Sequence, residues 1–202
     1  MGVRVLVIAA IWLAACGGDG AAGGAPDAAS PVDGATGPDA PPGAKRIFIS
    51  SAKFAGQFGG LAGADYACVA AAQDAQLNGN WVAWLSSSTV DAIDRVHDVG
   101  PWYDLGGNMI FADRANLMTS PLTALWLDEH GSFLPSDRIW TATGPGGRYQ
   151  EAIPGHAPCA EWTAGVMVED AQVGQVGHQD GGWTSAFSTS CDQQGHLICL
   201  EQ

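Results

Sequence analysis

Basic residues are scarce in this chain of 202 residues. Lys and Arg together number eight against 21 Asp and Glu, so the formal net charge is −13. Proteins that bind nucleic acid, heparin-like polymers or anionic headgroups rely on Lys and Arg that displace counterions. The composition therefore argues against nucleic acid and every other polyanion as a partner.

Catalytic signatures are also missing. The sequence contains no Gly-x-Ser-x-Gly elbow, no His-Glu-x-x-His, no phosphate-binding loop and no dinucleotide fingerprint. The histidines are scattered singly, as His97, His130, His156, His178 and His196. A lone histidine is more often a hydrogen-bonding group of a loop or core than a catalytic residue. We therefore predict no catalytic residues and no cofactor.

Two groups of acidic residues are candidates for a catalytic or metal-binding site. Asp91 and Asp94 have the i, i+3 spacing that acid/base catalysis could use, but carboxylates in the first turn of a helix explain the pair more simply. Residues 128–131 (Asp-Glu-His-Gly) could offer oxygen ligands to a divalent cation. A solvated turn between Leu127 and Phe133 is the expected structure.

No apolar run is long enough to span a bilayer. Residues 5–13 are apolar and follow a positive N-terminus, a pattern typical of a signal peptide, which we place at residues 1–15. The sequence ending at Cys16, Leu-Ala-Ala-Cys, resembles a lipobox. This resemblance predicts cleavage before Cys16 and its diacylation with chains of the palmitate type. The alternative is an ordinary signal peptide that happens to contain a cysteine.

A tether is expected after the lipid anchor. Residues 17–44 are almost entirely Gly, Ala, Pro, Asp and Ser, and Val32 is their only large apolar side chain. Such a segment cannot bury enough surface to fold, so we assign residues 16–45 as a lipidated, disordered linker with a reach of about 30 Å. Gly17, rather than Asp, follows the cysteine. By resemblance to envelope lipoproteins, this implies the outer membrane, if the cell has one.

The remaining residues, 46–202, carry the pattern of a folded α+β domain. Residues 46–50 are β-rich, residues 81–86 read as a mostly buried strand, and Ser88 with Asp91 has capping-box spacing for a short helix through Val96. Helical spacing joins Leu61, Ala64, Cys68, Ala72 and Ala75, which places Cys68 on a buried face. Further short apolar runs lie at 109–111, 125–127, 139–142, 166–168 and 196–200. The long Gly/Pro-rich stretches between them predict a loop-rich domain.

Four cysteines remain once Cys16 carries lipid. They are Cys68, Cys159, Cys191 and Cys199, an even set in a chain expected to be exported to an oxidising compartment. No Cys-x-x-Cys and no metal-ligand spacing with histidine accompanies them, so disulfides are favoured over zinc. Three pairings remain open.

The tryptophans divide into two groups. Five lie within apolar runs and are expected to be buried: Trp81, Trp84, Trp126, Trp140 and Trp162. Trp102 and Trp183 stand beside glycines and polar residues on expected loops, where ligand contacts are often built. Asp180 and Trp183 are therefore the candidate ligand-binding residues. The alternative for Trp183 is a loop anchor packed on the core.

The order of these residues resembles a known family. The segments that resemble the endostatin domain are Tyr66-Ala67-Cys68, 81–87 (WVAWLSS), 102–111 (WYDLGGNMIF), 139–148 (IWTATGPGGR), 159–162 (CAEW) and Cys191-x7-Cys199-Leu200-Glu201. Residues 46–50 and 59–65 also resemble a bacterial lipoprotein domain family of unassigned function. Both families have a C-type-lectin-like fold. The resemblance covers residues 46–202 and implies nested disulfides, Cys68–Cys199 and Cys159–Cys191.

Several binding features of these families have no counterpart here. No histidine precedes Arg46, so the zinc ligands of endostatin are missing, and most of its heparin-binding arginines are missing too. The tripeptides of calcium-dependent sugar-binding lectins (Glu-Pro-Asn, Gln-Pro-Asp, Trp-Asn-Asp) do not occur. The resemblance thus implies a fold and leaves the ligand open.

Three functions follow as expectations. The first is a non-catalytic recognition module in the cell envelope, anchored to the membrane by lipid, that binds an extracellular protein or glycan. The second is an envelope structural or adhesion protein, which a smooth surface beside Asp180 and Trp183 would favour. The third, a hydrolase with a spatially assembled site, would be favoured by a strongly perturbed carboxyl or histidine in a cleft.

Overall fold

The structure is a computed structural model that describes residue 41 and residues 43–202. The predicted signal peptide, the lipidation site at Cys16 and nearly all of the linker lie outside the described residues. Within the described part, no helix is long and apolar enough to cross a membrane. These residues form the mixed α+β domain that the sequence predicts, with two disulfides.

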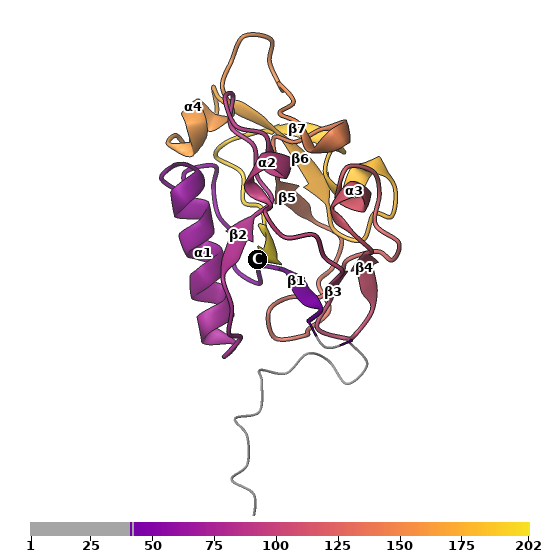
Figure 1. Cartoon of the computed structure of the whole chain (residues 1–202). Helices are drawn as coiled ribbons and strands as arrows, with labels where there is room; N and C mark the ends of the chain where they lie inside the picture. The colour runs from indigo at the N-terminus through magenta and orange to yellow at the C-terminus, as the bar shows by residue number, and fades with distance from the viewer. Residues whose placement is uncertain (1–40, 42) are drawn as a thin grey trace, which may run out of the picture. The chain divides into compact units, whose positions relative to one another are not determined.

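A five-stranded sheet joins the two ends of the domain (Figure 1). Its strands lie in the order β2 (Trp81–Ala83), β8 (Ile198–Glu201), β1 (Lys45–Ile49), β3 (Trp102–Tyr103) and β4 (Met109–Phe111). β1 pairs antiparallel with β8, where Phe48 lies opposite Cys199, and parallel with β3. The first and last strands are therefore neighbours in the sheet.

Helix α1 (Gly60–Asp74) packs beside β2 on one side of this sheet (Figure 1). Ala64, Cys68 and Ala72 are its buried residues, which confirms the face predicted from helical spacing. Cys68 forms a disulfide with Cys199, and their Cα atoms lie 5.4 Å apart. The helix is thereby fixed to the last strand.

A second, antiparallel sheet and several short helices form the rest of the domain. The sheet has the order β5 (Arg138–Trp140), β6 (Asp170–Gln175) and β7 (Phe187–Ser190). The short helices are α2 (Ala92–Arg95), α3 (Arg114–Leu117), α4 (Cys159–Trp162) and the 3-10 turns η1 (Pro145–Gly147) and η2 (Gly181–Trp183). The second disulfide joins Cys159 of α4 to Cys191, just after β7. Both bridges have the nested pairing that the endostatin resemblance implies.

Two clusters of buried side chains form the core. Ile47 and Ile49 belong to one cluster, whereas Phe48 between them belongs to the other, as the alternation of side chains along a strand requires. Both disulfides lie in the cluster of Phe48. The tryptophans Trp84, Trp102 and Trp183 belong to the cluster of Ile47.

The structure differs from the sequence predictions in four elements. Strands β6 and β7 were not predicted, because their sequences, DAQVGQ and FSTS, lack an apolar run. The apolar run at residues 166–168 is exposed and belongs to no helix or strand. Trp102 lies buried in β3 and not on a loop. Helix α2 begins after Asp91, so the capping box predicted from Ser88 does not form.

Candidate functional site

Two loops meet at the end of the smaller sheet. Residues 119–127 follow α3, and residues 175–183 leave β6 and end in η2. Three hydrogen bonds join the loops: Gly177 N donates to Leu125 O at 3.1 Å, Trp183 Nε1 donates to Thr119 O at 3.1 Å, and Gln179 Nε2 donates to Leu122 O. Because each loop holds the other, their surface is organised before any ligand arrives.

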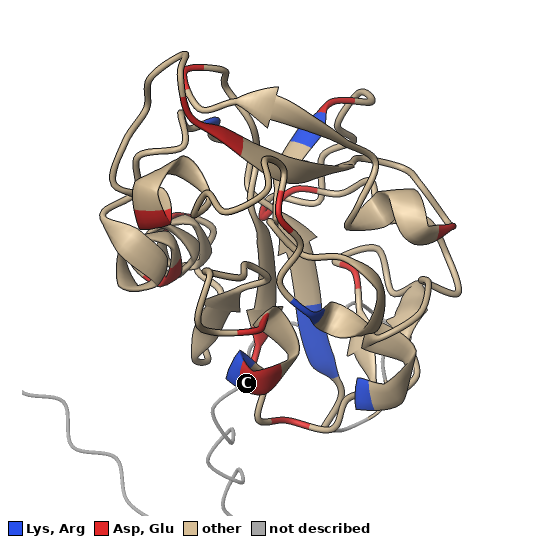
Figure 2. Cartoon of the chain, turned by 90° about the horizontal axis from the view of Figure 1, so that it is seen from above, with Lys and Arg blue, Asp and Glu red and all other residues tan. Residues whose placement is uncertain are grey.

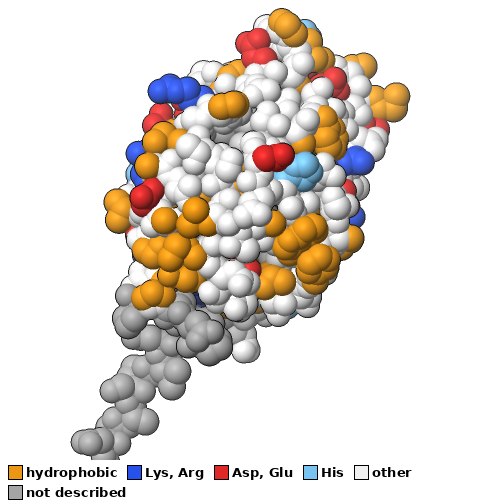
Figure 3. All heavy atoms as spheres, turned by 90° about the vertical axis from the view of Figure 1, so that its right-hand side faces the viewer, with side chains coloured by type: hydrophobic (Ala, Val, Ile, Leu, Met, Phe, Trp, Pro, Cys, Tyr) orange, Lys and Arg blue, Asp and Glu red, His pale blue; other side chains and the backbone are white. Residues whose placement is uncertain are grey.

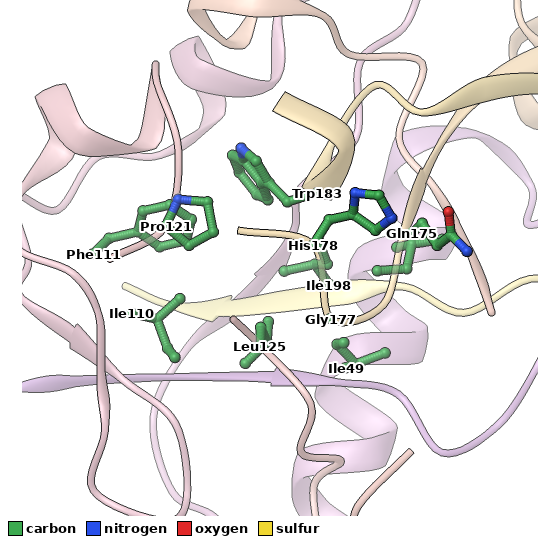
Figure 4. A pocket seen from close by; sticks show the side chains of 11 residues that line it. Ile49, Ile110, Phe111, Pro121, Leu125, Gln175, Gly177, His178, Trp183 and Ile198 are labelled. Atoms are coloured by element: carbon green, nitrogen blue, oxygen red, sulfur yellow. The ribbon is translucent and has the colours of Figure 1, made fainter. Parts of the chain in front are cut away.

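The cavity between these loops is too small for a ligand. It has a volume of about 10 Å³ and is lined by apolar side chains together with Gln175 and His178 (Figure 4). That is about the space of one water molecule. Any ligand of this region must therefore bind on the surface above the cavity.

Trp183 lies in the core below this surface. It is 4% exposed, its ring stacks on Trp84 with centroids 5.2 Å apart, and Phe111 covers it at 4.9 Å. Its indole N–H donates a hydrogen bond to the carbonyl oxygen of Thr119. A ligand could not reach the face of this ring, so the geometry matches the loop-anchor interpretation of Trp183.

Asp180 lies at the surface, as its loop position suggests. Its Oδ1 is 3.0 Å from Nδ1 of His178 and accepts a hydrogen bond from Gly182 N at 2.9 Å. The bond with His178, followed by that from Gly182, lowers the pKa of the Asp180 carboxyl below its ordinary value of 3.8. Asp180 thus presents a fixed carboxylate to the solvent.

An aromatic pair lies next to this loop. It consists of Phe133, which the sequence does not single out, and Trp126, which the sequence predicts as buried and which is partly buried. Trp126 and Phe133 stack with ring centroids 4.8 Å apart and planes at 20°, and Phe133 is 66% exposed. Gly177 crosses the Trp126 ring so closely that a Cβ there would lie 2.0 Å from it. Phe133 follows Gly131 and Ser132, the same glycine and polar setting that singled out Trp183, and this signal could have found it.

We call Phe133, Trp126, His178 and Asp180 the aromatic–acidic surface. The loop of residues 175–183 is drawn in gold on the right of Figure 1, and Figure 3 turns that side toward the viewer. Figure 3 shows separate groups of hydrophobic side chains there, with few charged side chains among them. An apolar platform beside isolated polar groups is the usual composition of a recognition surface.

Residues 128–131 form the turn between Leu127 and Phe133 that the sequence predicts, but its two carboxylates are buried instead of solvated. Asp128 and Glu129 are 5% and 4% exposed. Asp128 accepts hydrogen bonds from the backbone N–H groups of His130 and Ser132, and Glu129 accepts them from the backbone and hydroxyl of Ser51. Local hydrogen bonds thus compensate the burial of both carboxylates. Among residues 43–202, no group of three or more His, Cys, Asp or Glu side chains is placed to hold a metal ion.

The other titratable candidates have structural partners. Asp91 is the residue before α2, and its carboxylate accepts a hydrogen bond from Tyr149 N at 2.7 Å instead of capping the helix. His196 is 1% exposed, and its Nδ1 lies 2.6 Å from Ser50 O. Burial lowers the pKa of His196 below its ordinary value of 6.5. His196 does not line either cavity described for this domain.

Comparisons with known proteins add no assignment to this geometry. No family model matches the chain, and no curated protein matches it.

Proposed function

We propose that this protein is a lipid-anchored recognition module of the cell envelope, which binds an extracytoplasmic protein or glycan without catalysis. One observation carries the proposal. The exposed phenyl ring of Phe133 stacks on Trp126, and the Trp126 ring lies against Gly177 of the loop that carries the Asp180 carboxylate.

The arrangement of the domain supports a C-type-lectin-like fold for this module. Its first and last strands pair, its long helix follows the first strand, and one disulfide joins that helix to the last strand. The second disulfide is nested inside the first. This nested pairing is what the resemblance to the endostatin domain implies. Most residues in the second half of the domain lie in loops, which suits a fold that displays variable surfaces.

The chemistry of the aromatic–acidic surface fits a large, uncharged or cationic ligand. Aromatic rings offer rigid apolar area with little conformational entropy to lose, and a carboxylate accepts hydrogen bonds from hydroxyl or amide groups. The domain carries few basic side chains among many acidic ones (Figure 2). A polyanionic ligand would therefore be repelled.

Binding to arrays tests the proposal. The full chain, purified in non-ionic detergent, is applied to arrays of peptidoglycan fragments, envelope oligosaccharides and purified envelope proteins, with and without calcium. We expect at least one ligand whose binding falls about tenfold in Phe133→Ala and in Asp180→Asn. Phe187→Ala is the matched control, because Phe187 is an exposed aromatic residue of β7 that lies outside the aromatic–acidic surface. Equal loss in all three variants, or no ligand at all, would contradict the proposal.

The second candidate function is an envelope structural or adhesion protein. The cavity volume of about 10 Å³ beside Trp183 favours it, because the surface there is nearly closed. A flat surface of this kind suits a macromolecular contact better than a small ligand. An adhesion protein would retain cell-to-cell or cell-to-surface attachment in Asp180→Asn while losing it when the anchor at Cys16 is removed.

A further inference from the structure

A second hollow lies on the other side of the domain, between α1 and the loop after β1. Its volume is about 380 Å³, within the usual range of ligand pockets, which begins near about 300 Å³. It is lined by Ser51, Ala52 and Phe54, by Tyr66, Ala67, Ala70, Ala71 and Asp74 of α1, and by Glu129. We call it the α1 groove. It shares no lining residue with the cavity beside Trp183.

The groove combines apolar walls with carboxylates at one end. The alanines of α1 and the ring of Phe54 provide the apolar surface. Glu129 and Asp74 provide the charge, and no Lys or Arg is among the described residues that line the groove. Glu129 is 4% exposed and is held in place by Ser51, so its charge cannot turn away to the solvent. Ser51 donates a hydrogen bond to each oxygen of Glu129 without neutralising its charge, so an ammonium group in the groove would be attracted to this carboxylate.

We propose that the α1 groove binds a small organic cation, an alkylammonium with about four to six carbons. Its carbon chain lies along Ala67, Ala70 and Phe54, and its ammonium group faces Glu129 and Asp74. Tyr66 stands at the groove with 74% of its surface exposed and offers the face of its ring to the same cation. This site is independent of the aromatic–acidic surface, so either can fail without the other.

His130 is the neighbour that competes for the same carboxylates. Its Nε2 lies 3.5 Å from Asp74 Oδ2 and 3.8 Å from Glu129 Oε1. The imidazole ring therefore lies beside the position proposed for the ammonium group. Binding is measured at about pH 8, where an alkylammonium keeps its charge.

Calorimetric titration of the full chain with pentylamine tests the site, and pentanol, which has the same carbon chain without charge, is the ligand control. We expect pentylamine to bind with a Kd of about 1 mM or less, and pentanol to bind at least about tenfold more weakly. Equal binding of the two compounds, or no heat from pentylamine, would overturn the proposal. If a lysine-containing peptide bound about tenfold more tightly than the small amine, the assignment of the α1 groove to a small-molecule ligand would be overturned.

Variants of α1 and Glu129 separate the groove from the rest of the surface. Ala70→Phe fills the groove from an exposed helix position and is expected to abolish binding, whereas Ala62→Phe, equally exposed on α1 but outside the groove, leaves it unchanged. Asp74→Asn, which removes an exposed charge, weakens binding about threefold, and Glu129→Gln weakens it at least about tenfold. Circular dichroism confirms folding of each variant. Normal binding by folded Ala70→Phe would refute the site.

Discussion

The left-handed turn at α4 predicts that one alanine-to-glycine substitution stabilises this protein. All four residues of α4 have positive φ angles, from 47° at Cys159 to 63° at Trp162. A left-handed conformation costs a residue with a Cβ about 1–2 kcal/mol, and glycine avoids this cost. The turn persists because Cys159 is bridged to Cys191, and because the buried indole of Trp162 donates a hydrogen bond to Ser86 O at 2.7 Å.

Ala160 is the residue of this turn at which substitution by glycine removes the fewest side-chain contacts. Its φ is 50° and its methyl group is exposed, so no packing is lost. Glycine removes about 1–2 kcal/mol of strain but costs about 0.5–1 kcal/mol in unfolded-chain entropy. The free energy of unfolding should therefore rise in Ala160→Gly, by up to about 1.5 kcal/mol.

Urea denaturation of the oxidised protein measures this change directly. Ala70→Gly is the matched control, because Ala70 is equally exposed but lies in the right-handed helix α1. There, glycine should lower the free energy of unfolding by about 1 kcal/mol. The alanine-to-glycine substitution should thus raise the free energy of unfolding at Ala160 and lower it at Ala70. Destabilisation of both variants by the same amount would refute the reasoning.

Three further predictions concern other parts of the domain. The double variant Cys159→Ala/Cys191→Ala should lose about 4 kcal/mol of unfolding free energy, because the bridge closes a loop over a sequence separation of 32 residues. Calorimetry under oxidising conditions measures this loss, and a loss of less than about 1 kcal/mol would contradict the prediction. Burial lowers the pKa of His196 from 6.5, so below about pH 6.5 the unfolded chain binds more protons there than the folded protein does. Stability should therefore fall as the pH drops from about 6.5 toward the folded pKa, by up to about 1.4 kcal/mol per pH unit, and urea titrations of His196→Asn should show a smaller fall. Gly177→Ala would place a Cβ 2.0 Å from the ring of Trp126 at a residue with φ 82°. Binding to any ligand found on the arrays should then fall at least about tenfold, and unchanged binding would exclude the aromatic pair from the site.

The elements that the sequence predicts are those with apolar runs or helical spacing. The segments at residues 46–50 and 196–200, each with a short apolar run, contain most of β1 and β8. The buried face of α1 follows from the spacing of Ala64, Cys68 and Ala72. Strand β7 consists of small polar residues and one exposed phenylalanine. Its pairing with β6 comes from tertiary contacts that local patterns do not contain.

The candidate site was predicted only in part, and for a physical reason. Asp180 and Trp183 are three residues apart, so the sequence treats them as one loop feature. Residues in a one-turn helix point in different directions, and η2 turns the indole of Trp183 toward Trp84 while Asp180 stays outside. Phe133 reaches the same surface from a distant loop, which no local pattern could show.

The proposed role requires an exported, lipid-bearing chain whose folded domain is held by two disulfides. Mass spectrometry of the protein isolated from its native membranes, alkylated before any reduction, tests this most directly. We predict a chain that begins at Cys16 with a diacylglyceryl group and yields the linked peptides Cys68–Cys199 and Cys159–Cys191. A chain that retains Met1, or alkylated and therefore free thiols at these four cysteines, would contradict the account.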